Sequence, residues 1–340
     1  MITKKRCLTA LIMIFTFFIL QGCQSPKQGK NETDPIEASQ VIKYVNKYGL
    51  IEDKKAWNKV LKDTNNGEEI TSYDELDKAV KIANHHASIS KSGLQSWQAS
   101  PTMYVDKKHN LKIINLPSTF PDTSLTSKKY KSASAQYIKK AQDLIKEVPS
   151  TQPIIFNLAN NFGGDPYEMI GATSDFIPNG LLWTEITKDN QKTKVFLKER
   201  SIKIKGSNNS LAVSILAHRL NSKKVYVITN ERTASAAEFT LLALKKNPNV
   251  VIVGHSTVGD ISANGGLSFG KSKKSSAIIP IAWIKTPIKI NGKDEFDSDP
   301  IKPDIMINYP PVNTRSNKQS PLDDDFLDEM IQKTNNFQNT

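Results

Sequence analysis

The stretch KVYVITNERTASAAEFTLLALKK, residues 224–246, joins an apolar run to a segment with helical spacing through a short polar turn. The run VYVIT has the continuous apolar character of a strand buried on both faces, and FTLLALKK repeats apolar residues at helical spacing. Ser235 lies between them, inside the alanine-rich sequence TASAAE. The stretch therefore predicts a strand, a tight turn and a helix, a unit typical of a sheet covered by helices.

Short apolar runs of the same kind recur along the chain and alternate with segments of helical spacing. The expected strands are LKIINL (111–116), PIIFNL (153–158), LLWTEI (181–186), TKVFL (193–197), VVIVG (250–254) and AIIPIAW (277–283). The expected helices are 134–148, 167–177 and 320–333. This alternation predicts an α/β core over residues 108–335. Within it, the polar stretch 186–222 lacks a strong helical pattern and is expected to form a cap or insertion.

The region before this core, residues 34–100, reads as an N-terminal helical subdomain. Its helices are expected to begin near Asp34, Asp53 and Ser72. Ser72 opens the sequence SYDE, which is a capping-box pattern.

The first 22 residues predict a signal peptide, with lysine and arginine followed by the apolar run LTALIMIFTFFIL. The run LQGC at its end resembles the lipobox of bacterial lipoproteins, in which Cys23 receives the lipid and becomes the mature N-terminus. Residues 23–33 would then be a polar tether. An ordinary secretory signal with a chance cysteine is the alternative.

Composition narrows the class of partner. The chain has 340 residues, two cysteines and a net charge of +12. Cys7 lies in the expected signal peptide, so we expect no disulfide framework. The charge favours anionic lipid headgroups or wall polymers, or simply keeps the surface soluble. Dispersed lysines without a recognition motif argue against nucleic acid. No HExxH, CxxC or phosphate loop is present, so no metal or cofactor is expected.

Two interpretations of Ser235 follow from its position at a helix N-terminus. It is either a helix N-cap or a nucleophile, because the helix N-terminus offers N–H groups to an oxyanion. The sequence NNFGGD, with Gly163 and Gly164, follows the expected strand 153–158 and can present further backbone donors. A hydroxyl and a set of backbone donors are what acyl transfer requires.

Taken in order, NNFGGD, TASAAE, VVIVG and PIKPD resemble the tail-specific, or C-terminal-processing, serine peptidases over roughly residues 35–310. That resemblance implies a ClpP/crotonase-like spiral core. It makes Ser235 the nucleophile, Glu238 the glutamate of the SAxE motif, and the amides of Gly164 and Ala236 the oxyanion donors.

Two departures from the main pattern point to one branch of that family. Many members have a lysine base 25 residues after the serine, where this chain has Asp260. About 20 residues separate the helical subdomain from the strand at Leu111, too few for the family's PDZ module. The runs FIPNGLLWTEI, GDISAN and DPIKPD resemble the branch that cleaves lantibiotics such as nisin outside the cell.

In that branch, a histidine at the end of the helical subdomain is the base. The resemblance places it at Ala87 without a gap, so a shift of one residue would bring in His86, with His85 as the alternative. The alternative to a catalytic role is that His85 and His86 are surface histidines that interact favourably with the C-terminal end of a helix. His255 is a further candidate, whereas no motif surrounds His109 or His218.

The loop before the glycines also departs from the family, because Asn157–Asn161 (NLANN) replaces DLRGN. Either Asn157 braces the loop by hydrogen bonds, or catalysis is impaired. The sequence thus predicts a lipid-anchored extracellular serine endopeptidase, with a lantibiotic as a candidate substrate. The alternatives are a catalytically weak homologue that sequesters peptides, and a processing peptidase of envelope proteins.

Overall fold

The computed structural model of the chain describes residues 35–92, 97–120, 127–199, 201–206, 210–214, 222–270, 274–308, 310–311 and 322–337. The expected signal peptide, Cys23, the tether and His218 lie outside these residues. Within them, no helix has both the length and the apolar character needed to cross a membrane.

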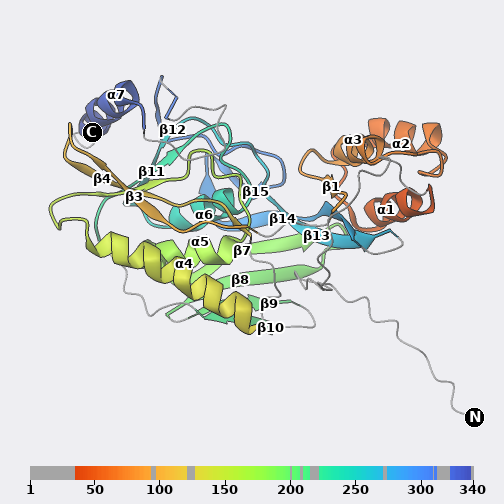
Figure 1. Cartoon of the computed structure of the whole chain (residues 1–340), viewed down its shortest axis with the longest axis horizontal. Helices are drawn as coiled ribbons and strands as arrows, with labels where there is room; N and C mark the ends of the chain where they lie inside the picture. Colours follow the sequence, from red (N-terminus) through yellow and green to blue (C-terminus); the bar gives the residue numbers. More distant parts are fainter. Residues whose placement is uncertain are drawn as a thin grey trace, which may run out of the picture.

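Three helices form a separate unit at one end of the molecule, on the right in Figure 1. They are α1 (Pro35–Tyr48), α2 (Lys54–Asp63) and α3 (Tyr73–Ala83). Asp53 and Ser72 cap α2 and α3, with side chains that accept from Ala56 N (2.9 Å) and Glu75 N (3.2 Å). The apolar faces of the three helices pack around the buried Trp57 in a hydrophobic cluster of their own.

A six-stranded sheet carries the strand that precedes Ser235. Its order is β16 (Ile305–Met306), β12 (Val250–Gly254), β11 (Val225–Thr229), β6 (Ile154–Asn157), β4 (Leu111–Asn115) and β3 (Thr102–Asp106). All neighbours are parallel except the β3–β4 pair. Since parallel strands end at a common edge, the loops after β6, β11 and β12 meet there.

An eight-stranded sheet lies beside it and is antiparallel in its pairings. Its path is β1 (Ser88–Ser90), β14 (Ser275–Ile290), β7 (Gly180–Thr187), β8 (Lys192–Lys198), β9 (Ser201–Lys205) and β10 (Ser210–Ser214). Strands β13 (Ser262–Phe269) and β15 (Lys293–Phe296) pair with β14. A small third sheet pairs β2 (Trp97–Gln98) with β5 (Thr119–Phe120).

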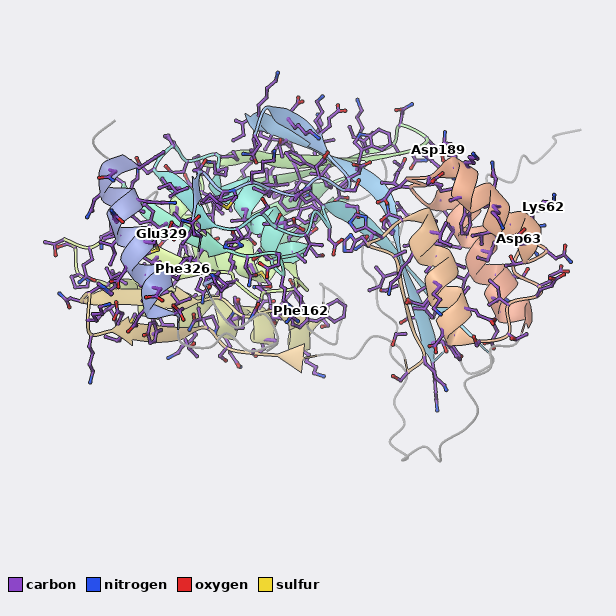
Figure 2. All side chains as sticks on the ribbon, turned by 90° about the horizontal axis from the view of Figure 1, so that it is seen from above. Lys62, Asp63, Phe162, Asp189, Phe326 and Glu329 are labelled. Atoms are coloured by element: carbon purple, nitrogen blue, oxygen red, sulfur yellow. The ribbon has the colours of Figure 1, made fainter. Side chains whose placement is uncertain are left out.

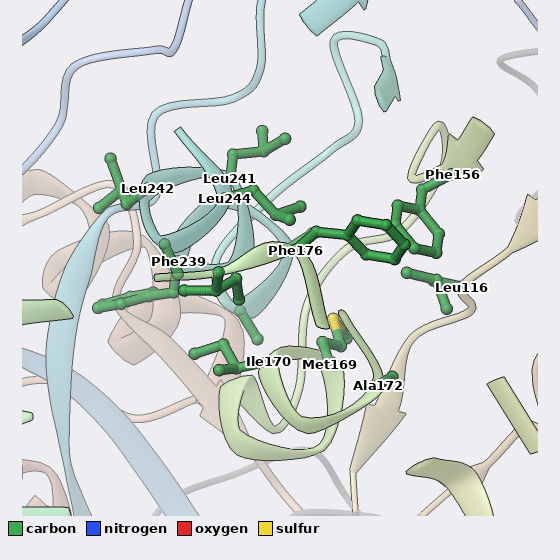
Figure 3. Close-up of a cluster of buried hydrophobic side chains, with 14 of the residues drawn as sticks. Leu116, Phe156, Met169, Ile170, Ala172, Phe176, Phe239, Leu241, Leu242 and Leu244 are labelled. Atoms are coloured by element: carbon green, nitrogen blue, oxygen red, sulfur yellow. The ribbon is translucent and has the colours of Figure 1, made fainter. Parts of the chain in front are cut away.

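The main hydrophobic core fills the space between these sheets and their helices. The helices of this part are α4 (Lys128–Lys146), α5 (Pro166–Thr173), the 3-10 turn η1 (Ser174–Phe176), α6 (Ala236–Leu244) and α7 (Asp324–Phe337). Figure 3 shows Phe156 of β6 against Phe176, with ring centroids 5.7 Å apart. Helix α7 covers the opposite face of the six-stranded sheet with Phe326, Leu327 and Met330.

The hairpin β13–β14 links the core to the helical unit, and Figure 2 shows its strands running between the two. Phe269, Ala277 and Ile279 of the hairpin belong to the helical unit's hydrophobic cluster. Leu50 N also donates to Pro280 O at 2.8 Å. The hairpin therefore packs against the helical unit as well as belonging to the eight-stranded sheet of the core.

The structure confirms the expected α/β class, and every apolar run singled out in the sequence is a strand. Some bounds differ: α4 begins at Lys128 rather than at 134, and the glycine-containing strand β13 had no apolar run to reveal it. The stretch 186–222 supplies β8, β9 and β10. Its role as a cap stays a prediction.

Candidate active site

Ser235 occupies the N-cap position of α6 with a backbone that ordinary caps do not adopt. Its φ is 53° and its ψ is −119°, whereas the caps Ser72 and Ser127 are extended, with φ of −133° and −69°. A positive φ outside the left-handed helical region is strained for a residue with a Cβ, and such strain clusters at functional sites. The side chain is partly exposed. This geometry favours the nucleophile over the cap.

Glu238 holds this turn in place from inside the protein. Its carboxylate accepts hydrogen bonds from Ser235 N (2.9 Å), Gly259 N (2.8 Å) and the Thr257 hydroxyl. Glu238 is fully buried, and this burial raises its pKa to about 7. The residue of the SAxE motif therefore fixes the nucleophile's backbone and ties it to the loop that follows β12.

The diglycine after β6 lies directly against the serine. An ideal Cβ on Gly163, whose φ is 99°, would lie 2.7 Å from Ser235 Cβ and 3.0 Å from Ala236 N. A Cβ on Gly164 would lie 1.9 Å from Thr119 O. Only glycine fits such close backbone approaches. In the described part of the chain, neither Gly164 N nor Ala236 N donates a hydrogen bond, so both remain available to an oxyanion.

Asparagine side chains brace the loop NLANN in the absence of the family's charged pair. Asn157 Nδ2 donates to Asn115 Oδ1 (2.9 Å), and Asn157 Oδ1 accepts from Ala159 N (2.9 Å). Asn161 Oδ1 accepts from Gly163 N (2.9 Å). All these asparagines are buried, where satisfied polar networks give rigidity.

A second set of bonds ties this loop to the serine turn. Asn160 N donates to Asn230 Oδ1 (3.0 Å), and Asn230 Nδ2 donates to Asn160 Oδ1 (2.9 Å). Ala234 N donates to Asn161 O (2.9 Å). Neutral amides thus brace the loop. This agrees with the possibility that Asn157 replaces the family's charged residues by hydrogen bonds.

His86 lies in a closed hydrogen-bonded ring with two residues of β13. Its Nδ1 is 2.8 Å from Ser262 Oγ, Ser262 Oγ donates to Asn264 Oδ1 (3.3 Å), and Asn264 Nδ2 donates to His86 Nε2 (3.3 Å). The directions of donation assign the proton to Nδ1 and leave Nε2 with its lone pair. Burial lowers the pKa of His86 below its ordinary value. His86 is therefore a neutral imidazole with its Nε2 ready to accept a proton.

His85 has the opposite character. Its Nδ1 is 2.7 Å from Glu52 Oε1, and its Nε2 is 3.0 Å from Asp260 Oδ1. Contact with the Asp260 carboxylate, supported by Glu52, raises the pKa of His85 to about 9. A histidine that stays protonated at neutral pH is a poor base. Asp260, which replaces the family's lysine, instead joins the helical unit to the loop held by Glu238.

The structure thus gathers Ser235, the diglycine and Glu238 at one edge of the six-stranded sheet. His85 contacts Asp260, and His86 contacts Ser262. These contacts join the helical unit to the segment that follows β12. Among the described residues, His86 bonds to Ser262 and Asn264 rather than to Ser235.

The sequence analysis assigned no role to Ser262 and Asn264, although both belong to the run GDISAN that matched the branch. The other described histidines lie elsewhere. His255 Nδ1 is 3.7 Å from Glu231 Oε2, and His109 bridges Asp106 and Asp328. Within the described residues, no group of three or more histidine, cysteine, aspartate or glutamate side chains is arranged so that it could hold a metal ion.

The chain is similar to known proteins over most of its length. The model of peptidase family S41 matches residues 118–307, more than half of the chain. The nisin-resistance protein of Lactococcus lactis subsp. lactis is 25% identical over 275 residues, which are 78% of this chain and 81% of that protein.

Two solved structures share the fold. A lipoprotein from Streptococcus agalactiae has a TM-score of 0.60 at 20% identity, covering 86% of this chain and 96% of that one. A putative peptidase from Parabacteroides merdae has a TM-score of 0.54 at 13% identity, covering 88% and 96%. With the strained serine, the diglycine and the family match together, the chain belongs to peptidase family S41, a family of serine peptidases.

Proposed function

We propose that the chain is a lipid-anchored serine endopeptidase on the outer face of the cell membrane, with Ser235 as nucleophile and His86 as general base. The observation that carries this proposal is the strained turn at Ser235, which lies against Gly163 beside the amides of Gly164 and Ala236, neither of which donates a hydrogen bond within the described residues. The neutral His86, whose Nε2 carries the lone pair and accepts only a long 3.3 Å hydrogen bond from Asn264 Nδ2, supports the choice of base.

The acylation step follows from these groups. Nε2 of His86 takes the Ser235 hydroxyl proton as Oγ attacks the scissile carbonyl carbon. The carbonyl oxygen becomes an oxyanion that accepts from Gly164 N and Ala236 N. As the carbon–nitrogen bond breaks, the imidazolium returns the proton to the leaving amine. Water activated by His86 then hydrolyses the acyl ester.

Ser262 orients the base in this mechanism. It accepts from His86 Nδ1–H, the role that a carboxylate has in many serine peptidases. Asn264 contacts Nε2 at 3.3 Å and must release it when the Ser235 hydroxyl approaches. A neutral orienting residue stabilises the imidazolium less than a carboxylate would, and nearby Asp260 supplies the negative charge.

We further propose that the substrate is a peptide, with lantibiotics as the first class to test. The similarity to a nisin-resistance protein over most of both chains supports this class. The LQGC run and the likeness to a streptococcal lipoprotein support lipidation at Cys23.

A second candidate function is peptide sequestration without turnover. It is favoured by one observation, the engagement of His86 with Ser262 and Asn264 instead of Ser235. A binding protein would hold the peptide but leave its bonds intact.

Mass spectrometry of peptide products separates the two functions. Residues 24–340, which keep every described element, would be incubated with nisin and with an unstructured peptide of similar length. We expect cleavage that is lost in Ser235→Ala and falls about 10²–10⁴-fold in His86→Ala. Ser222→Ala, an exposed serine that precedes β11 and so lies at the other end of that strand from Ser235, is the matched control and should cleave normally.

Each result has a distinct meaning. Binding of intact peptide by the wild type would support sequestration and refute the peptidase. Full activity in His86→Ala, with loss in His85→Ala, would move the base to His85. Cleavage of the unstructured peptide with nisin left intact would retain the peptidase and reject the lantibiotic.

A further inference from the structure

The strands β8 and β9 carry an outward row of lysines, which we call the lysine face. Its members are Lys192, Lys194 and Lys198 of β8, and Lys203 and Lys205 of β9. All five are exposed. Figure 1 shows β8 and β9 side by side in the lower part of the molecule, with β10 next to β9.

The hydrophobic core fixes the direction of these side chains. Side chains alternate between the faces of a strand, and Val195, Leu197, Ile202 and Ile204 of the same strands are fully buried in the main core. A shift by one residue would bury the lysines and expose this apolar set. The lysines are therefore held outward as an ordered array.

The register concentrates positive charge within the array. Lys194 lies directly opposite Lys205, and Lys203 lies opposite Phe196. Like charges at opposed positions destabilise a sheet. In the part of the chain that the structure describes, none of the five lysines forms an ion pair that would relieve this repulsion. By contrast, Lys285 on β14 pairs with Glu295 on the neighbouring strand.

We propose that the lysine face binds the surface of a lipid bilayer that contains anionic headgroups. An anionic partner would turn the repulsion between Lys194 and Lys205 into attraction. Lysine is a compact charge on a flexible stem, suited to mobile headgroups rather than to one fixed ligand geometry.

The half-buried Phe196 favours a bilayer over a soluble anionic polymer. Its ring lies among the lysines, with Lys205 Nζ 5.8 Å from the ring centroid. Aromatic rings beside lysines are typical of surfaces that settle at the boundary between headgroups and acyl chains. Bound in this way, the β8–β9 side of the protein would face the membrane. This inference does not depend on the identity of the catalytic base or of the substrate.

Vesicle flotation tests the inference with residues 24–340, which lack the expected lipid attachment site. The vesicles are phosphatidylcholine alone and phosphatidylcholine with phosphatidylglycerol. The test variant replaces Lys194, Lys203 and Lys205 by glutamine. The matched control replaces Lys54, Lys55 and Lys62 of α2, which are equally exposed, and so removes the same charge.

We expect the wild type to bind only the anionic vesicles, and salt to weaken this binding. Each lysine near an anionic surface contributes about fivefold, so the test variant should bind about 100-fold more weakly and the control nearly as the wild type. Thermal melting of all three proteins verifies that they are folded, and unchanged peptide cleavage verifies that the site is intact.

Equal losses in the test and control variants would overturn the proposal, since binding would then follow net charge alone. Equal binding to both kinds of vesicle would overturn it as well. Binding to soluble poly(glycerol phosphate) but not to vesicles, with the same loss in the test variant, would replace the lipid surface by a wall polymer.

Discussion

Substitution of Ser235 by glycine should stabilise the fold while it abolishes catalysis. The backbone of Ser235, with φ of 53° and ψ of −119°, is accessible to glycine without the steric cost that a Cβ imposes. Relief of such strain is worth about 2 kcal/mol, and the greater chain entropy of glycine in the unfolded state removes about 0.5–1 kcal/mol. The free energy of unfolding should therefore rise by about 1 kcal/mol.

If Ser235 were an ordinary N-cap, its substitution by glycine would instead lower the free energy of unfolding. Replacing an ordinary cap by glycine costs a few tenths of a kcal/mol, and replacing it by alanine costs about 1 kcal/mol. Ser72 is such a cap in the same chain, with an extended backbone and a hydrogen bond from Glu75 N. Ser72→Gly is thus the matched control, and it should be slightly less stable than the wild type.

Urea denaturation of the wild type, Ser235→Gly, Ser235→Ala and Ser72→Gly measures these differences. We expect Ser235→Gly to unfold at the highest urea concentration and Ser235→Ala to remain near the wild type, because alanine keeps the strain. A loss of stability in Ser235→Gly equal to that in Ser72→Gly would refute the strained turn and restore the cap.

Three further predictions concern the groups around the serine. Because burial lowers the pKa of His86, kcat/KM should rise with pH with a midpoint below about 6.5, and a midpoint near 9 would point to His85 instead. The pKa of His85 is raised, so its stabilising ion pairs are complete below pH 6.5 and are lost as pH rises through about 9. The difference in free energy of unfolding between wild type and His85→Gln should therefore shrink over that range. A constant difference in denaturation experiments would contradict this. Gly163→Ala should abolish peptide cleavage because its Cβ meets Ser235, whereas Gly180→Ala, with φ of 117° but no backbone atom nearby, should lose stability and keep its activity per folded molecule.

Much of the core could be predicted from the sequence because its strands are buried on both faces. Runs such as VYVIT and VVIVG are continuously apolar for that reason, and all became central strands. Strand β13 was not predicted because Gly265 and Gly266 interrupt any apolar pattern. It is stabilised by its pairing with β14 rather than by a sequence signal of its own.

The chemistry was predictable in kind and only partly in detail. TASAAE identified Ser235, yet a positive φ at a serine is a property of tertiary packing that no local pattern encodes. The difference between His85 and His86 has a similar origin. It depends on Asp260 and Ser262, which lie more than 170 residues away in sequence and meet the histidines only in the fold.

The loop NLANN shows what composition alone could not resolve. Loss of the family's charged residues suggested a weakened oxyanion site, because the bracing partners were unknown. Asn115 and Asn230 supply them from neighbouring strands and turns, at hydrogen-bond distances of 2.9–3.0 Å. Side-chain amides can replace a charged pair where every donor finds an acceptor.

Covalent labelling by a fluorophosphonate tests the central claim most directly, since it needs the nucleophile, the base and the oxyanion donors but no knowledge of the substrate. We predict a single adduct on Ser235, located by peptide mass spectrometry, that is absent in Ser235→Ala and forms far more slowly in His86→Gln than in His85→Gln. An unlabelled Ser235 in the folded wild type, or equal labelling rates in the two histidine variants, would contradict the proposed pair of Ser235 and His86.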